Sequence, residues 1–66
     1  MRFKVFYKPS DYVDELREFT GIFLGLETSH DGSDGNVDAT TYYHFVLEDS
    51  SLRAVPCHQI KIMEAQ

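Results

Sequence analysis

The alternation of apolar and polar side chains between Thr40 and Met63 constrains the fold of this chain more than any other feature. A strand with one face on a core repeats every two residues, and this period returns in three successive segments. The side chains expected on the core face are Thr41, Tyr43, Phe45 and Leu47, then Leu52 and Ala54, then Ile60 and Ile62. The short intervals between the segments predict the closing half of a small β-barrel.

Two further strands are predicted in the first half of the chain, over residues 2–8 and 21–28. Their expected core faces carry Phe3, Val5 and Tyr7 in the first strand and Ile22, Leu24 and Leu26 in the second. Gly21 and Gly25 suit positions where a sheet bends or another backbone comes close. Residues 10–20 read as a long loop with at most one helical turn, so the chain is predicted to be mainly β.

The end of the chain resembles the end of an SH3 domain. In the segment Leu-Arg-Ala-Val-Pro-Cys-His-Gln-Ile-Lys-Ile, residues 52–62, a strand runs into a proline, a short helical turn and an apolar-x-apolar last strand. The resemblance implies one domain over residues 1–66, a five-stranded SH3-like small barrel with a long first loop and a helical turn before the last strand. It also implies that Pro56 lies on a peptide-binding face. Gln59 replaces the family's aromatic residue there, and the tryptophan that opens its third strand is missing.

The net charge of −5 is unevenly distributed. Residues 10–38 hold eight acidic side chains against Arg17 alone, whereas residues 1–9 hold three basic side chains and no acid. A field of this sign repels phosphate backbones, so it favours a basic protein partner over nucleic acid.

Cys57 is the only cysteine, which excludes an intrachain disulfide and is typical of a reducing compartment. No apolar run approaches the ~18 residues of a membrane span, and the first residues alternate like a strand rather than a signal peptide. We therefore expect a cytoplasmic protein. Its small core leaves no room for a deep substrate cavity, which favours a binding module over an enzyme.

Two motifs suggest metal sites, but neither has complete ligand spacing. The segment Asp34–Asp38 matches the first half of a calcium loop, yet Ala39 stands where the turn needs glycine and Phe45 where a bidentate glutamate should close the shell. Zinc ligands could come from three histidines and a thiol, which lack the usual spacing: His30, His44, His58 and Cys57. No cofactor or metal is predicted, and no base or pocket is indicated for a nucleophilic Cys57.

Several apolar side chains fall on the strand faces opposite the expected core: Phe6, Phe23, Tyr42, Val55 and Met63. One interpretation is that the 10–20 loop packs over them through Tyr12, Leu16 and Phe19. The other is that some stay exposed and mark a partner or self-association surface.

The main functional hypothesis is a small non-catalytic protein-interaction module, of the size typical of bacterial or phage accessory proteins. The candidate contact residues are Tyr12, Phe23, Tyr42 and Pro56, with an acidic rim of Asp31, Asp34 and Asp38 that steers a basic partner. Homodimerisation through an edge strand would extend this hypothesis. The alternative is a nucleic-acid-binding small barrel, in which Phe6 or Tyr42 stacks on bases and phosphates contact Arg2, Lys4, Lys8 and Lys61.

Overall fold

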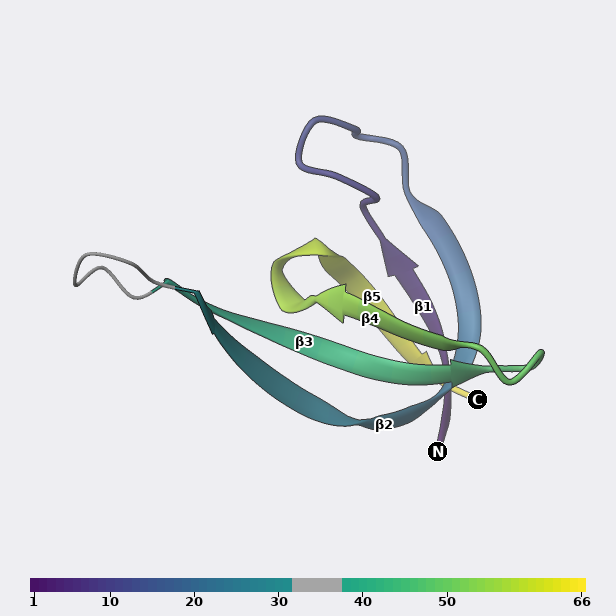
Figure 1. The fold of residues 1–66 in the computed structure, drawn as a ribbon. Coiled ribbons are helices and arrows are strands. Elements are labelled where there is room, and N and C mark those ends of the chain that lie inside the picture. The colour runs from purple at the N-terminus through teal and green to yellow at the C-terminus, as the bar shows by residue number, and fades with distance from the viewer. Residues whose placement is uncertain (32–37) are drawn as a thin grey trace.

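The computed structural model describes residues 1–31 and 38–66, and its described part is mainly β (Figure 1). Within these residues, five antiparallel strands form one sheet of order β4-β3-β2-β1-β5. The strands are β1 (Arg2–Tyr7), β2 (Arg17–Asp31), β3 (Asp38–Leu47), β4 (Leu52–Pro56) and β5 (Ile60–Ala65), and a 3-10 turn, η1 (Cys57–Gln59), precedes β5. The predicted fold class, strand number and helical turn are confirmed.

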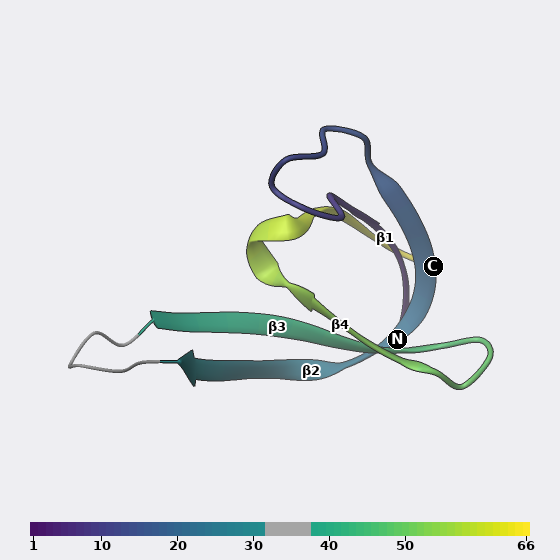
Figure 2. The same cartoon turned by 45° about the horizontal axis from the view of Figure 1, so that its top comes forward.

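The long strand β2 belongs to both halves of the sheet. Residues 17–22 pair with β1, and residues 21–31 pair with β3. Because β2 bends between these two partners, the sheet curls so that β1 and β5 face β3 and β4 (Figure 2). The sheet is not closed, since β4 and β5 are its two edge strands in the described part of the chain.

Gly21 lies where β2 passes from one partner to the other. It pairs with Phe3 on β1 and with Leu47 on β3. A Cβ atom at this position would lie 3.1 Å from both the Val46 carbonyl oxygen and Leu47 Cδ2. The sequence-based expectation of a close backbone approach at Gly21 is therefore confirmed.

The core is small and largely aromatic. Val5 and Phe45 are fully buried, and the ring of Phe45 packs against those of Phe19 and Phe23, with centroids 5.1 and 5.6 Å away. The guanidinium of Arg53 lies 5.1 Å from the centre of the Phe19 ring. The Arg53 side chain covers one side of the aromatic cluster, which would otherwise be exposed to water.

Arg53 also donates a hydrogen bond of 3.2 Å to the Tyr7 hydroxyl. Arg53 belongs to β4 and Tyr7 to β1, so this bond joins the two halves of the curled sheet. The contact holds together strands that do not pair with each other directly.

The predicted boundaries and core face of β2 are wrong. The strand begins at Arg17, not at Gly21. In the first part of β2, Phe19 and Gly21 lie on one face, whereas Glu18, Thr20 and Ile22 lie on the other. Placing Ile22 inside would therefore also bury the Glu18 carboxylate. Phe23 instead continues the inner row opposite Phe45, and Ile22 is exposed.

A β-bulge then interrupts the alternation of β2 at Leu24, where Phe23 pairs with Phe45 and Gly25 pairs with His44. Gly25 has a φ of +147°, a backbone conformation that L-residues with a side chain rarely adopt. Beyond the bulge the strand leaves the core, so Leu24 and Leu26 are 57% and 60% exposed although both were expected inside.

The predicted core face of β4 is also wrong. Val55 is buried, whereas Leu52 is 76% exposed and Ala54 is exposed. The register explains the difference, because Tyr43 on the inner face of β3 pairs with Val55, and Val46 on the outer face pairs with Leu52.

In β5, a register shift between Phe6 and Tyr7 separates two residues that were expected on the same face. Ile60 pairs with Tyr7 and is half-buried, but Ile62 pairs with Phe6 on the outer face and is 47% exposed. Met63, opposite the buried Val5, takes the inner position instead.

The turn between β3 and β4 is held by a carboxylate. Asp49 Oδ1 accepts hydrogen bonds from the Ser51 hydroxyl at 2.6 Å and from the Ser51 backbone N–H at 3.0 Å. These bonds favour the charged form and hold the pKa of Asp49 below its ordinary value. Ser50, between them, has a φ of +69°, as the tight turn requires.

Replacing each of the two glycines of β2 with alanine should destabilise the fold, for different reasons. In Gly21→Ala the added methyl meets a carbonyl oxygen, and we expect the free energy of unfolding to fall by about 1–3 kcal/mol. In Gly25→Ala the methyl enters open space, and backbone strain alone costs about 1–2 kcal/mol. Urea unfolding measures both losses.

Replacing Gly25 with D-alanine separates backbone strain from the effect of the added methyl group, because D-alanine prefers a φ of positive sign. A chain of this length can be made by chemical synthesis. The chain with D-alanine at position 25 should recover the wild-type urea midpoint. Equal losses from L- and D-alanine at this position would contradict the strain argument.

The Asp49 carboxylate should stabilise the protein above the ordinary aspartate pKa of 3.8, and this contribution should disappear as the pH falls through the lower folded pKa. In Ser51→Ala the hydroxyl donor is lost, so the pKa of Asp49 in an NMR titration should rise toward its ordinary value. The stability difference between wild type and variant should vanish in acid. An unchanged Asp49 titration in the variant would refute the assignment.

Candidate protein-interaction site

Two of the predicted contact residues lie side by side at one end of the sheet. Pro56 is the last residue of β4 and the N-cap of η1, and it pairs directly with Tyr42 on β3. Both side chains are half-buried. The extended backbone of Pro56, with φ −57° and ψ 137°, turns the chain from the edge strand into η1.

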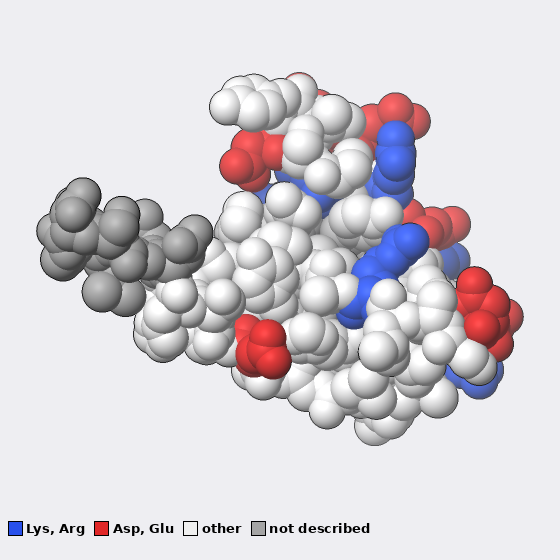
Figure 3. Space-filling view, in the orientation of Figure 1, with Lys and Arg blue, Asp and Glu red and all other residues white. Residues whose placement is uncertain are grey.

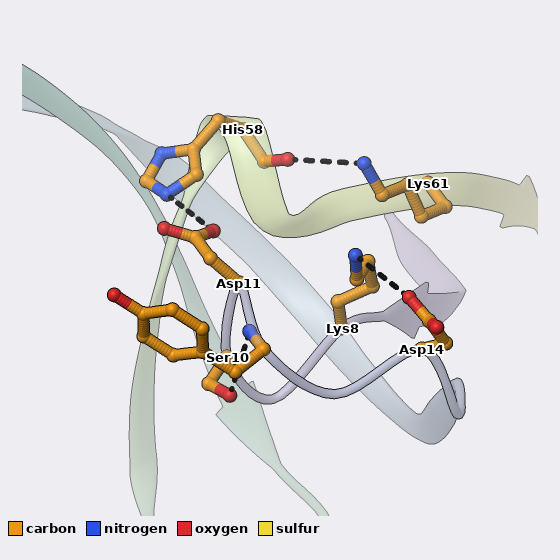
Figure 4. A network of polar contacts seen from close by, with 7 residues as sticks. Lys8, Ser10, Asp11, Asp14, His58 and Lys61 are labelled. Carbon is orange, nitrogen blue, oxygen red and sulfur yellow. Dashed lines mark hydrogen bonds and ion pairs between the residues drawn. The ribbon is translucent and has the colours of Figure 1, made fainter.

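The loop between β1 and β2 reaches this end of the sheet and is tied to η1 (Figure 4). Asp11 Oδ1 lies 3.6 Å from His58 Nε2, and the Lys8 backbone N–H donates a 2.9 Å hydrogen bond to the Gln59 carbonyl. Lys8 Nζ also lies 3.6 Å from Asp14 Oδ1 within the loop. The loop is thereby fixed against η1 at two points.

Tyr12 follows Asp11 in this loop and has its ring in solvent. Its backbone N–H donates a 3.3 Å hydrogen bond to Ser10 Oγ, yet its side chain is 97% exposed. The loop therefore presents an aromatic ring beside η1 and leaves it without apolar cover. Leu16, in the same loop, is exposed too, so the expectation that Tyr12 and Leu16 cover the sheet is wrong.

Charged groups surround this end of the sheet more than they cover it. In the space-filling view, a basic group lies across β4 and an acidic group lies near β3, with uncharged surface between them, and acidic groups stand at the β1–β2 loop (Figure 3). Two exposed acids of that loop have basic neighbours: Asp14 pairs with Lys8, and Asp11 lies 3.6 Å from the His58 imidazole. A ligand that lies along the uncharged surface would meet carboxylates at its margin.

The structure separates Phe23, Asp31 and Asp38 from this cluster. Phe23 packs among core rings, 6.2 Å from Phe3 and 5.6 Å from Tyr43 between ring centroids, so its predicted outward orientation is wrong. Asp31 and Asp38 pair at the far end of the hairpin formed by β2 and β3 (Figure 1). Asp34, with the candidate calcium segment, lies outside the described residues.

Sequence reasoning missed the contact between Asp11 and His58. The two residues are far apart in the chain, and neither belongs to a motif. The sequence offered two signals. Ser10 and Asp11 in the first loop are residues that cap helices, and the polar His58 lies inside the predicted helical turn. Only the curl of the sheet brings the two segments together.

Among the described residues, the side chains that could bind a metal or act as a nucleophile do not come together in one site. In residues 1–31 and 38–66, no three side chains of His, Cys, Asp or Glu converge as a metal site would require. Cys57 is a free, exposed thiol at the start of η1. Nor does any helix among the described residues have the length and apolar character to cross a membrane.

Acidic neighbours partly neutralise the basic side chains of the first strand. Lys4 Nζ lies 3.4 Å from Glu18 Oε2, and Lys8 pairs with Asp14. Arg53, on β4, is stacked on core aromatic rings.

Comparisons of the chain with protein-family models, curated proteins and solved structures found no match.

Loss of the tie between Asp11 and His58 should loosen the first loop without unfolding the protein. In His58→Ala, the ¹⁵N order parameters of residues 10–14 should fall from about 0.85 toward 0.6. The coupling free energy between Asp11→Ala and His58→Ala in a double-mutant cycle should stay under about 1 kcal/mol, because both side chains are exposed. Glu15→Ala, in the same loop, is the matched control and should leave the order parameters unchanged.

Proposed function

We propose that the protein is a small, non-catalytic interaction module that captures a segment of another protein at the end of the sheet where β4 runs into η1. The observation that carries this proposal is Tyr12, whose ring is held in solvent by an ordered loop. Tyrosine is among the side chains most enriched at the energetic centres of protein interfaces. The three contact residues are Tyr12, Tyr42 and Pro56.

The architecture supports the comparison with SH3-like barrels. The strand order β4-β3-β2-β1-β5, the long first loop and η1 before β5 follow the arrangement expected for such a barrel. In that family the proline at the start of the helical turn lies on the peptide-binding face, and Pro56 has this place here. Tyr42, which pairs with Pro56, supplies an aromatic ring beside it.

The partner segment that fits this surface is apolar with basic residues at its ends. The half-buried side chains of Tyr42 and Pro56 accept apolar side chains of a ligand, and the carboxylates of the β1–β2 loop attract cations. The net charge of −5 favours the approach of a basic partner over that of a nucleic acid. The ion pairs of Lys4 and Lys8 further weaken the nucleic-acid alternative.

Selection from a random peptide library displayed on phage tests the proposal directly. We expect enrichment of peptides that combine apolar residues with Lys or Arg. In ¹H–¹⁵N spectra, the selected peptides should shift the amide signals of Tyr12, Tyr42 and residues 56–59. Tyr12→Ala and Tyr42→Ala should each weaken binding at least tenfold, which is about 1.4 kcal/mol.

The matched control is Leu52→Ala, since Leu52 is exposed on the same edge strand but at the opposite end from η1. This variant should bind as wild type does, and the thermal unfolding of all variants should be recorded beside the affinity. Full-strength binding by folded Tyr12→Ala and Tyr42→Ala would contradict the proposed surface. Strong binding of single-stranded RNA or DNA at low salt would favour the alternative.

A further inference from the structure

The strand β2 is an interior strand in its first half and an edge strand in its second. β1 pairs with it through Ile22, and the last contact on that side is the 3.0 Å hydrogen bond from the Phe23 N–H to the Met1 carbonyl. From Leu24 to Asp31, β2 is paired only with β3. This part projects as a two-stranded arm, and the outer side of β2 faces away from the rest of the molecule (Figures 1 and 2).

Three edges of the described sheet, those of β4, of β5 and of the second half of β2, differ in how they are protected. Exposed edges usually carry lysine, proline or a charged row that prevents pairing with another chain. The β4 edge carries Arg53 and ends at Pro56, and the β5 edge carries Lys61 and Glu64. The free edge of β2, residues 24–30, reads Leu-Gly-Leu-Glu-Thr-Ser-His and holds neither proline nor lysine.

The same edge carries exposed apolar side chains. Leu24 and Leu26 are both more than half exposed and flank the bulge at Gly25. A shallow groove along the arm is lined by these three residues together with Glu27 and His44. An edge that is both unpaired and apolar is the kind of surface to which an extended strand adds.

We propose that the free edge of β2 pairs antiparallel with the same edge of a second copy of this chain. A two-fold axis near Thr28 fits the length of the free edge, since it aligns residues 25–31 of one copy with residues 31–25 of the other. Leu26 then lies opposite His30 of the second copy. Residues that lie opposite each other across this axis have their side chains on the same face of the joined sheet, as an isologous interface requires.

The charge along the free edge is compatible with a second copy as the occupant. Although each chain carries −5, residues 24–30 contribute Glu27 as their single acid. In the proposed register Glu27 lies opposite Ser29, so the two glutamates do not face each other directly. The acidic ends of the two arms point in opposite directions, which separates Asp31 and Asp38 of one copy from those of the other.

The central pair of this interface would extend a contact already in the structure. Thr28 Oγ1 and Thr41 Oγ1 lie 3.1 Å apart across β2 and β3. With Thr28 of each copy on the axis, four threonines form a row across the joined sheet, an arrangement that hydrogen bonds between neighbouring hydroxyls stabilise. The joined strands form a smaller interface than the roughly 800 Å² per partner of a standard one, so the dimer should be weak.

Sedimentation velocity over micromolar to millimolar concentrations tests the proposal. The wild-type sedimentation coefficient should rise with concentration from monomer to dimer. Leu26→Lys places a cation on the free edge and should keep the protein monomeric. Leu52→Lys changes a leucine on β4 that is even more exposed and should leave the dimerisation unchanged.

Disulfide trapping tests the register. In a Cys57→Ser background, Thr28→Cys should form a covalent dimer on mild oxidation, because residues on the axis have Cβ atoms about 4.5–5.5 Å apart. Leu52→Cys in the same background should not do so efficiently. A monomeric wild type at all concentrations would overturn the proposal, as would a Leu26→Lys variant that dimerises like wild type.

The two proposals are tested by different residues, Tyr12 for peptide binding and Leu26 for dimerisation, so they can fail independently. Leu26→Lys should still bind the peptides selected on the wild-type protein. Tyr12→Ala should still dimerise.

Discussion

The packing of Phe45 against Phe19 and Phe23 is the interaction on which the rest of this structure depends. Phe45 is fully buried in β3, and its two partners come from β2 on either side of Gly21. Aromatic pairs of this geometry contribute about 0.5–1.5 kcal/mol each beyond the area that they bury. Because both rings of β2 point inward, Ile22 must point outward, and the sheet bends at Gly21 between them.

The small size of this aromatic core explains why so many apolar groups remain exposed. Once the rings, Val5 and Val55 fill the interior, the second half of β2 has nothing to pack against, and it extends as an arm with Leu24 and Leu26 in solvent. The curl of the sheet has a second consequence, since it brings the first loop against η1 and leaves Tyr12 uncovered. One packing arrangement thus generates both proposed surfaces.

The sequence predicted the order of the strands and the helical turn along the chain, the inner face of β1 and the close backbone approach at Gly21, because these features depend on local alternation and on backbone geometry. The inner faces of β2 and β4 could not be predicted in this way. The face on which Phe23 lies depends on Glu18 and Gly21, in a part of β2 that lacks an alternating apolar row. The face on which Ile62 lies depends on the register shift between β1 and β5. The pairing of Tyr42 with Pro56 could not be predicted, because a turn over residues 48–51 would place Tyr43 opposite Pro56. The position of Tyr12 required the tertiary contact of Asp11.

Nuclear Overhauser effects between the aromatic rings and the methyl groups of β2 test the central claim most directly. The account predicts cross-peaks from the ring protons of Phe45 to those of Phe19 and Phe23, with none from Phe45 to the methyls of Ile22. Cross-peaks from the Ile22 methyls to the Phe45 ring, with Phe23 lacking contact to it, would show that β2 has the opposite face inside. That result would contradict the packing, the exposed arm and the proposed pairing of two copies together.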